Sequence, residues 1–183
     1  LEAAPSDWSS GIMLATAVST CYAANSDLGT GPCQGNRSFY SNSEDQASSR
    51  STAALLGQGM ANTNKIYARV TTAGGEATSN YAAGLAWAYS NNGKTDWFVP
   101  SKQELNELCK YANQQTTGDT SVACLGSGSL RSGFGTVGTI YWSSSEGIAA
   151  GAVNQFSQDF HDGDSQPYGR VNPWAVRFIR AFG

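Results

Sequence analysis

The side chains best suited to chemistry lie near the C-terminal end, in the segment "DFHDGDSQP". It contains Asp159, His161, Asp162 and Asp164, with Gly163 before the last aspartate, and His161 is the only histidine of the chain. Carboxylates grouped around a glycine turn are the hard oxygen ligands that Ca²⁺ uses, but the EF-hand spacing and its final glutamate are absent. A bound calcium ion stays an open alternative to a solvated acidic turn. We expect no metal site and no other cofactor.

A hydrolytic centre is the second chemistry that these residue types allow. The run Ser143–Ser145 precedes Glu146, and a serine nucleophile needs a histidine base and a carboxylate that orients it. His161 with Asp159 would supply both groups. The simpler interpretation is that the serine hydroxyls satisfy backbone groups near a strand end. We therefore expect no catalytic residues and no enzymatic activity.

The polar segment that contains these residues lies between two apolar strands. Thr139–Ser143 and Ala175–Phe182 are predicted strands, because β-branched and aromatic residues dominate them. Between them, tyrosine and tryptophan offer rigid contact area, while amides and a guanidinium offer hydrogen bonds, as in antibody combining sites. The same chemistry suits sugars, and an ordinary polar loop is the alternative. The predicted ligand-binding residues are Asn154, Gln158, Asp159, His161, Asp164, Gln166, Tyr168, Arg170, Asn172 and Trp174.

Composition narrows the class of protein. The 183 residues are typical of one domain, and only 14% are charged, against roughly 25% in ordinary globular proteins. The net charge is -3 and the lysines and arginines are scattered, so no basic stripe is present to neutralise nucleic-acid phosphates. No apolar run approaches the ~20 residues of a membrane span. We expect an extracellular or cell-surface protein; without a signal peptide, the chain is expected to be a trimmed or processed fragment.

Four cysteines form two local pairs in polar, turn-rich segments. Cys21 and Cys33 make up one pair, and Cys109 and Cys124 the other. An even number of cysteines in a chain of low charge favours disulfides over free buried thiols. Three connectivities are possible, of which these two local pairs are the simplest. Zinc is not expected, because the chain has no C-x-x-C motif and a single histidine.

Two helices have clear sequence signals. Ser79–Tyr89 repeats apolar residues every three or four positions, and we expect Gly93 to adopt a left-handed conformation at its C-terminal end. Farther along, Ser101 followed three positions later by Glu104 forms a capping box that starts the next helix. The predicted apolar face of this second helix consists of Leu105, Leu108, Cys109 and Ala112.

The remaining segments complete an α+β pattern. Ser9–Ala17 is a weak strand, Glu44–Met60 has helical spacing, and Cys21–Asn42 and Gly126–Gly138 are loops. We expect two or three helices packed on a twisted antiparallel sheet with long loops. Near the C-terminal end, two arginines are expected to pair with Glu146 or with backbone near the strand ends. These arginines are Arg177 and Arg180, and the predicted core tryptophans are Trp87, Trp97 and Trp142.

Four stretches together resemble a known family. They are "LEAAPSDW", "GQGMANTNKI", "NNGKTDWFVPSKQELNEL" and the pair "YWSSSE" and "VRFIRAF". They resemble the bacterial surface-exposed domain related to the C-terminal domain of the Legionella collagen-like adhesin. That family has a C-type-lectin-like fold, shared with formylglycine-generating enzymes and with the variable proteins of diversity-generating retroelements. The resemblance runs from Leu1 to Phe182.

The resemblance implies one C-type-lectin-like domain over residues 1–183, in which the two chain ends lie together. The Gly-rich apolar strand that precedes "LEAAP" in family members is absent here, so we expect the domain to lack its N-terminal strand. The segment after "YWSSSE" would carry the ligand surface, which is also where the retroelement-diversified members vary. We therefore expect an adhesin-like module that binds a glycan or a protein. The alternative is an assembly domain in a surface trimer or filament, with the same segment between subunits.

Overall fold

The computed structural model describes residues 1–6, 8–12, 51–73, 77–127, 129–135, 139–149, 152–170 and 172–181. The predicted Cys21–Cys33 disulfide and the predicted loop Cys21–Asn42 lie outside these residues. No helix among the described ranges combines the length and apolar character needed to cross a membrane.

The described strands form two sheets. The larger one has five strands in the order β2-β6-β3-β4-β5, and the smaller one pairs the first described strand, β1, with the last, β7. Neighbours are antiparallel except β3 and β6, which run parallel. The strands are β1 (Glu2–Ala3), β2 (Trp8–Ile12), β3 (Ile140–Ala149), β4 (Ala152–Asp159), β5 (Ser165–Tyr168), β6 (Trp174–Val176) and β7 (Ile179–Arg180).

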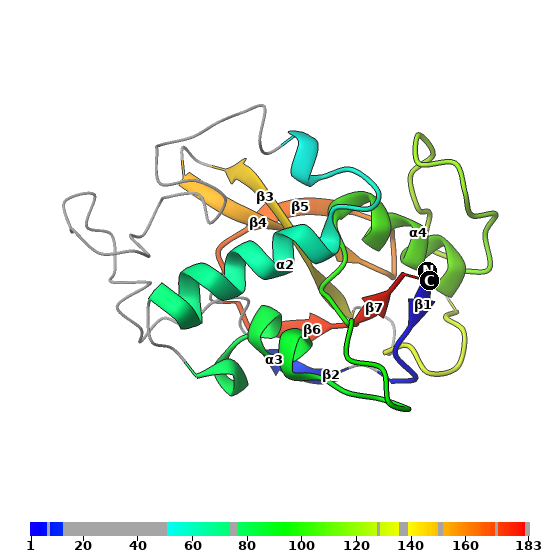
Figure 1. Ribbon diagram of the computed structural model, residues 1–183. Helices are drawn as coiled ribbons and strands as arrows, with labels where there is room; N and C mark the ends of the chain where they lie inside the picture. The colour runs from blue at the N-terminus through cyan, green and yellow to red at the C-terminus, as the bar shows by residue number, and fades with distance from the viewer. Residues whose placement is uncertain are drawn as a thin grey trace.

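Helices pack against this framework, so the predicted α+β class is confirmed (Figure 1). The helical segments are α2 (Gly59–Tyr67), the π-helix η2 (Ala68–Ala73), the 3₁₀ helix η3 (Thr78–Asn80), α3 (Ala82–Ala88) and α4 (Lys102–Ala112). Figure 1 also shows β1 and β7, the first and last described strands, side by side near α4. The predicted helix Glu44–Met60 lies outside the described residues up to position 50, and its described part is interrupted, because Gly57 has a φ of +85° that a helix cannot contain.

The segment that begins with the Ser101 and Glu104 capping box forms the expected helix, α4. The Ser101 hydroxyl accepts a hydrogen bond from the Glu104 amide, and the Glu104 carboxylate accepts one from the Ser101 amide at 2.7 Å. This reciprocal pair satisfies two amides that the first helical turn leaves without partners. The apolar face is buried as predicted, with Leu105 and Cys109 almost fully enclosed.

The predicted helix Ser79–Tyr89 is confirmed as α3, but two details differ. Trp87 is 49% exposed and its ring is stacked on Tyr67 at 4.1 Å, so its predicted place in the core is wrong. Gly93 does adopt a left-handed conformation, with a φ of +72°. It lies beyond the helix, in a turn closed by the bridge between Asn91 and Lys94, where Asn92 also has positive φ.

The buried apolar residues form two clusters. One contains Trp97, Trp142, Val176 and Phe178 and packs with buried alanines of α3. The other joins α4 to Phe98, Tyr141 and Phe160. Trp97 and Trp142 therefore occupy the core, as predicted.

The predicted strand Ala175–Phe182 is divided. Val176 ends β6 and Ile179 begins β7, so Arg177 and Phe178 are between two sheets. Arg177 donates to the backbone oxygen of Gly133, as the prediction of a backbone partner required.

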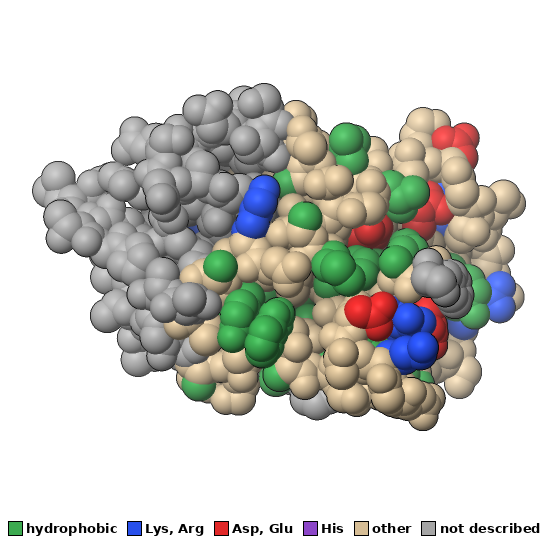
Figure 2. All heavy atoms as spheres, in the orientation of Figure 1, with side chains coloured by type: hydrophobic (Ala, Val, Ile, Leu, Met, Phe, Trp, Pro, Cys, Tyr) green, Lys and Arg blue, Asp and Glu red, His purple; other side chains and the backbone are tan. Residues whose placement is uncertain are grey.

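Arg180 does not follow its prediction. It pairs with the carboxylates of Glu2 at 2.8 Å and Asp96 at 2.9 Å rather than with Glu146 or backbone. Figure 2 shows acidic and basic side chains together beside the chain ends. The ion pairs reinforce the junction between β1 and β7.

Candidate functional site

Most of the polar C-terminal segment is a strand pair rather than a loop. β4 and β5 are antiparallel, with Gln155 opposite Tyr168 and Ser157 opposite Gln166. A short turn joins them, where Gly163 has a φ of +82° that favours glycine. Among the described strands, β5 is at an edge of the large sheet.

Strand alternation divides the predicted ligand residues between two faces. Side chains alternate between the two faces along a strand, so Gln166 and Tyr168, two residues apart on β5, share a face. By the same alternation, Asn154 and Gln158 point to the other face. Gln158 is buried and its amide nitrogen donates to the Asn106 side chain at 3.2 Å. The structure therefore does not bring Asn154 and Gln158 together with the tyrosine.

An aromatic pair dominates the accessible face. Tyr168 is 43% exposed, and its ring meets the half-buried Trp174 edge-on, with centroids 4.8 Å apart. Trp174 in turn packs 4.5 Å from the buried Trp142. Asn172, whose side chain donates to the Gly169 oxygen at 2.9 Å, shapes the turn into Trp174. We call Gln166, Tyr168, Asn172 and Trp174 the display surface.

Arg170 is part of the scaffold beneath this surface. Its guanidinium is 2.8 Å from the Glu146 carboxylate, and both side chains are buried. The expectation that Arg170 is exposed is therefore wrong, because its side chain is 2% exposed and lies against Glu146. A buried ion pair of this kind fixes a turn in place, since either charge alone is costly to bury.

Hydrogen bonds between neighbouring residues stabilise the acidic turn between β4 and β5. Asp159 accepts from the His161 amide at 2.7 Å, and Asp162 accepts from the Asp164 amide at 2.9 Å. Asp164 also accepts from the Gln166 side chain at 3.2 Å, which connects the turn to the display surface. Within the described part of the chain, no three histidine, cysteine or carboxylate residues are arranged to hold a metal ion.

The serine run is an irregularity inside β3 rather than its end. Between Trp142 and Glu146 the pairing with β4 shifts, and the Ser143 hydroxyl donates to the Phe156 oxygen of β4 at 2.9 Å. Ser144 donates to the Pro100 oxygen at 3.1 Å, and Ser145 donates to the Ala53 oxygen at 2.8 Å. The prediction that these hydroxyls satisfy backbone groups is confirmed.

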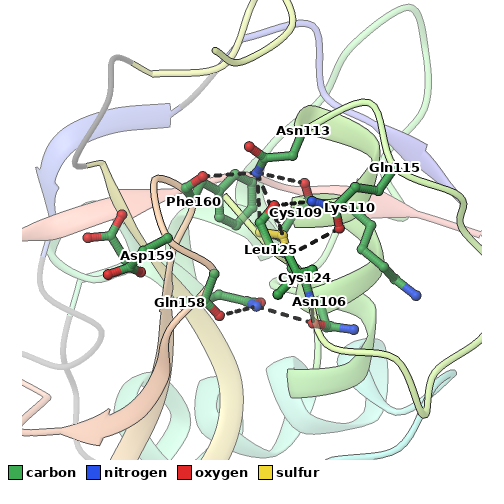
Figure 3. The surroundings of a disulfide bond; sticks show 12 residues. Asn106, Cys109, Lys110, Asn113, Gln115, Cys124, Leu125, Gln158, Asp159 and Phe160 are labelled. Carbon is green, nitrogen blue, oxygen red and sulfur yellow. Dashed lines mark hydrogen bonds between the residues drawn. A yellow bond between two sulfur atoms is a disulfide. The ribbon is translucent and has the colours of Figure 1, made fainter. Parts of the chain in front are cut away.

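The predicted Cys109–Cys124 disulfide is present beside the β4–β5 turn (Figure 3). Asn113, which follows α4, donates to the Phe160 oxygen at 2.9 Å and so joins the disulfide region to this turn. Gly163 lies against the Cys124 oxygen too closely for any side chain. The disulfide loop therefore supports the strand pair that carries the display surface.

Sequence reasoning did not identify Asn106 and Asn113 as supports of this turn. Asn106 accepts from the Cys124 amide at 2.8 Å and from the Gln158 side chain. The signal available was their spacing: positions 106, 109 and 113 recur every three or four residues, so the two amides share a helix side with Cys109.

Searches of protein families, curated proteins and solved structures found no match to this chain.

Proposed function

We propose that this chain is an adhesin-like binding module with a C-type-lectin-like fold, located outside the cell, whose ligand is a glycan. Two features support the fold. The first and last described strands, β1 and β7, pair with each other, as expected of a fold whose chain ends lie together. Helices also pack against a largely antiparallel sheet. The disulfide is consistent with a place outside the cell.

The observation that carries the proposal is the supported aromatic pair on an edge strand. Tyr168 is exposed, but it is held by Trp174, which rests on the buried Trp142. Little conformational entropy is therefore lost when a ligand contacts the tyrosine. Aromatic faces stack on the apolar side of a sugar ring, and the neighbouring amides of Gln166 and Asn172 can bond its hydroxyls.

The charges favour a neutral glycan over a sulfated one. Arg170 is buried in its ion pair, so it is not available to an anionic ligand. Asp162 and Asp164 are exposed in the adjoining turn and would repel sulfate or carboxylate groups. A protein surface is the other ligand that this chemistry accepts, and a glycan array separates the two.

The test is a glycan array probed with the oxidised protein and with two variants. Tyr168→Ala is expected to weaken capture of neutral glycans at least about tenfold. Trp87→Ala is the matched control, because Trp87 is an aromatic residue with a similar exposed fraction of 49% but lies on α3, outside the display surface. A chelator is expected to change nothing.

Three outcomes would contradict parts of the proposal. Binding by Tyr168→Ala equal to that of the unmodified protein would remove the display surface as the site. Loss of capture on chelation would make the acidic turn a calcium site. No glycan capture at all would leave a protein ligand or subunit assembly as the function of this face.

A further inference from the structure

A second candidate site lies at the other sheet, away from the display surface. A pocket of about 720 Å³ opens beside β1, between α4 and the loop that contains Phe134. Ala3, Leu108 and Ile179 contribute apolar side chains to its wall, and the exposed Leu56 and Tyr111 lie at its rim. This volume is in the range of known ligand sites, and the lining is mainly apolar.

The backbone of β1 presents two hydrogen-bonding groups on its outer edge. Ala4 donates to the Phe178 oxygen at 2.8 Å, and the register places Ala3 opposite Ile179. In an antiparallel pair, hydrogen-bonded and non-bonded positions alternate, so Ala3 is at a non-bonded position. Ile179 confirms this alternation, because its own N–H and C=O bond to Phe98 on the opposite side.

It follows that the N–H and C=O of Ala3 point away from β7. Neither group has a hydrogen-bond partner among the residues that the structure describes. Ala3 is only partly buried, and it lines the pocket. An extended peptide that adds to a sheet edge needs backbone hydrogen bonds and a pocket for one of its side chains. The N–H and C=O of Ala3 can supply the bonds, and the adjacent apolar pocket can hold the side chain.

The charges near the pocket are already engaged within the protein. The Glu104 carboxylate accepts from the amides of Gly57 and Gly59. Glu107 pairs with Lys110, and the guanidinium of Arg177 lies 4.5 Å from the Phe134 ring centroid while donating to a backbone oxygen. These walls therefore offer no ionic partner to a charged occupant, but they offer apolar contacts to an uncharged group.

From this geometry we infer that the pocket is a peptide-binding site. Its occupant is an extended, uncharged segment of a partner protein, added as a strand beside β1. Its backbone bonds to the N–H and C=O of Ala3, and one of its apolar side chains enters the pocket. The paired donor and acceptor at strand spacing favour a peptide over a small apolar molecule, which has no matching amide.

The first test selects linear peptides of about ten residues, the upper length of common strands, from a displayed library. Ala3→Pro is the decisive variant, because proline removes the outward N–H while the bonds between β1 and β7 do not use it. We expect uncharged peptides with apolar residues at alternate positions to be enriched on the unmodified protein. Their affinity for Ala3→Pro should be lower by at least about tenfold.

A second pair of variants tests the pocket without touching the strand. Leu56→Asp places a charge at the rim and should weaken the selected peptides by a similar factor. Leu125→Asp is the matched control, since Leu125 is also an exposed leucine but does not line the pocket. Methylation of single backbone nitrogens in a selected peptide should abolish binding only at the position that donates to Ala3.

Several results would overturn the inference. These are the absence of any enriched peptide, equal enrichment on Ala3→Pro, and equal effects of the two leucine variants. Thermal unfolding checks that each variant is folded. If sedimentation shows that the unmodified protein dimerises and that Ala3→Pro is monomeric, the occupant is a second copy of the chain rather than a different protein.

Discussion

At the scale of the residue, Glu104 connects three segments. Its carboxylate accepts hydrogen bonds from the amides of Ser101, Gly57 and Gly59, which joins the start of α4 to the turn before α2. Burial raises the pKa of Glu104 above its ordinary value of 4.5, against the opposite effect of these hydrogen bonds. A capping residue visible in the sequence thus also fixes a tertiary contact.

The pKa shift gives the first prediction. Between pH 4.5 and the raised pKa, the folded protein holds the Glu104 proton more tightly than the unfolded chain, so stability falls as pH rises through this window. Glu104→Gln should lower the free energy of unfolding by about 1–3 kcal/mol, because an amide nitrogen replaces one acceptor. Urea unfolding should show the largest loss near pH 4.5 and a smaller one at neutral pH; parallel pH profiles would contradict this.

The buried pair of Arg170 and Glu146 gives a second prediction. Arg170→Ala leaves the Glu146 charge buried without this guanidinium and should lower the free energy of unfolding by about 3–5 kcal/mol. Arg131→Ala, at an exposed arginine, should cost less than about 1.5 kcal/mol. Denaturant unfolding measures both. A stable Arg170→Ala protein that fails to bind ligand would instead restore Arg170 to the binding site.

At the scale of the element, the disulfide stiffens the loop that supports the β4–β5 turn. Cys109 and Cys124 are 15 residues apart, and closing such a loop stabilises a fold by about 3 kcal/mol. The variant Cys109→Ala/Cys124→Ala should therefore unfold at a clearly lower temperature. It should also exchange the amide protons around Gly163 faster. A variant with the original melting temperature would show that Asn113 and its hydrogen bonds suffice.

The sequence predicted α3 and α4 because their signals are local. A capping box and a repeat of apolar residues need no distant partner to be recognised. β5 was missed because it is short and has polar residues on both faces, so alternation in hydrophobicity is absent. Trp87 and Arg170 were misplaced for a related reason: whether each side chain is buried depends on which segment the fold places against it.

At the scale of the whole molecule, the two proposed sites belong to different sheets. The display surface is on β5, an edge of the large sheet, whereas the peptide site is on β1, in the small one. The core between the two sites consists of two clusters of buried apolar residues. Since packed cores resist small deformations, a ligand at one edge should leave the other edge unchanged.

This separation gives the last prediction, which is that the two sites act independently. Tyr168→Ala should weaken glycan capture and leave the affinity for a selected peptide unchanged, and Ala3→Pro should do the reverse. In the double variant, the two losses of binding free energy should add within about 0.5 kcal/mol, as they do for distant positions without shared partners. Calorimetric titration of each ligand in the presence of the other measures the coupling directly. A peptide that changes glycan affinity tenfold would contradict independence. It would mean that binding is transmitted between the sheets through β6 and β7, which are joined by Arg177 and Phe178. The chain would then be a regulated receptor rather than a module with two separate contacts.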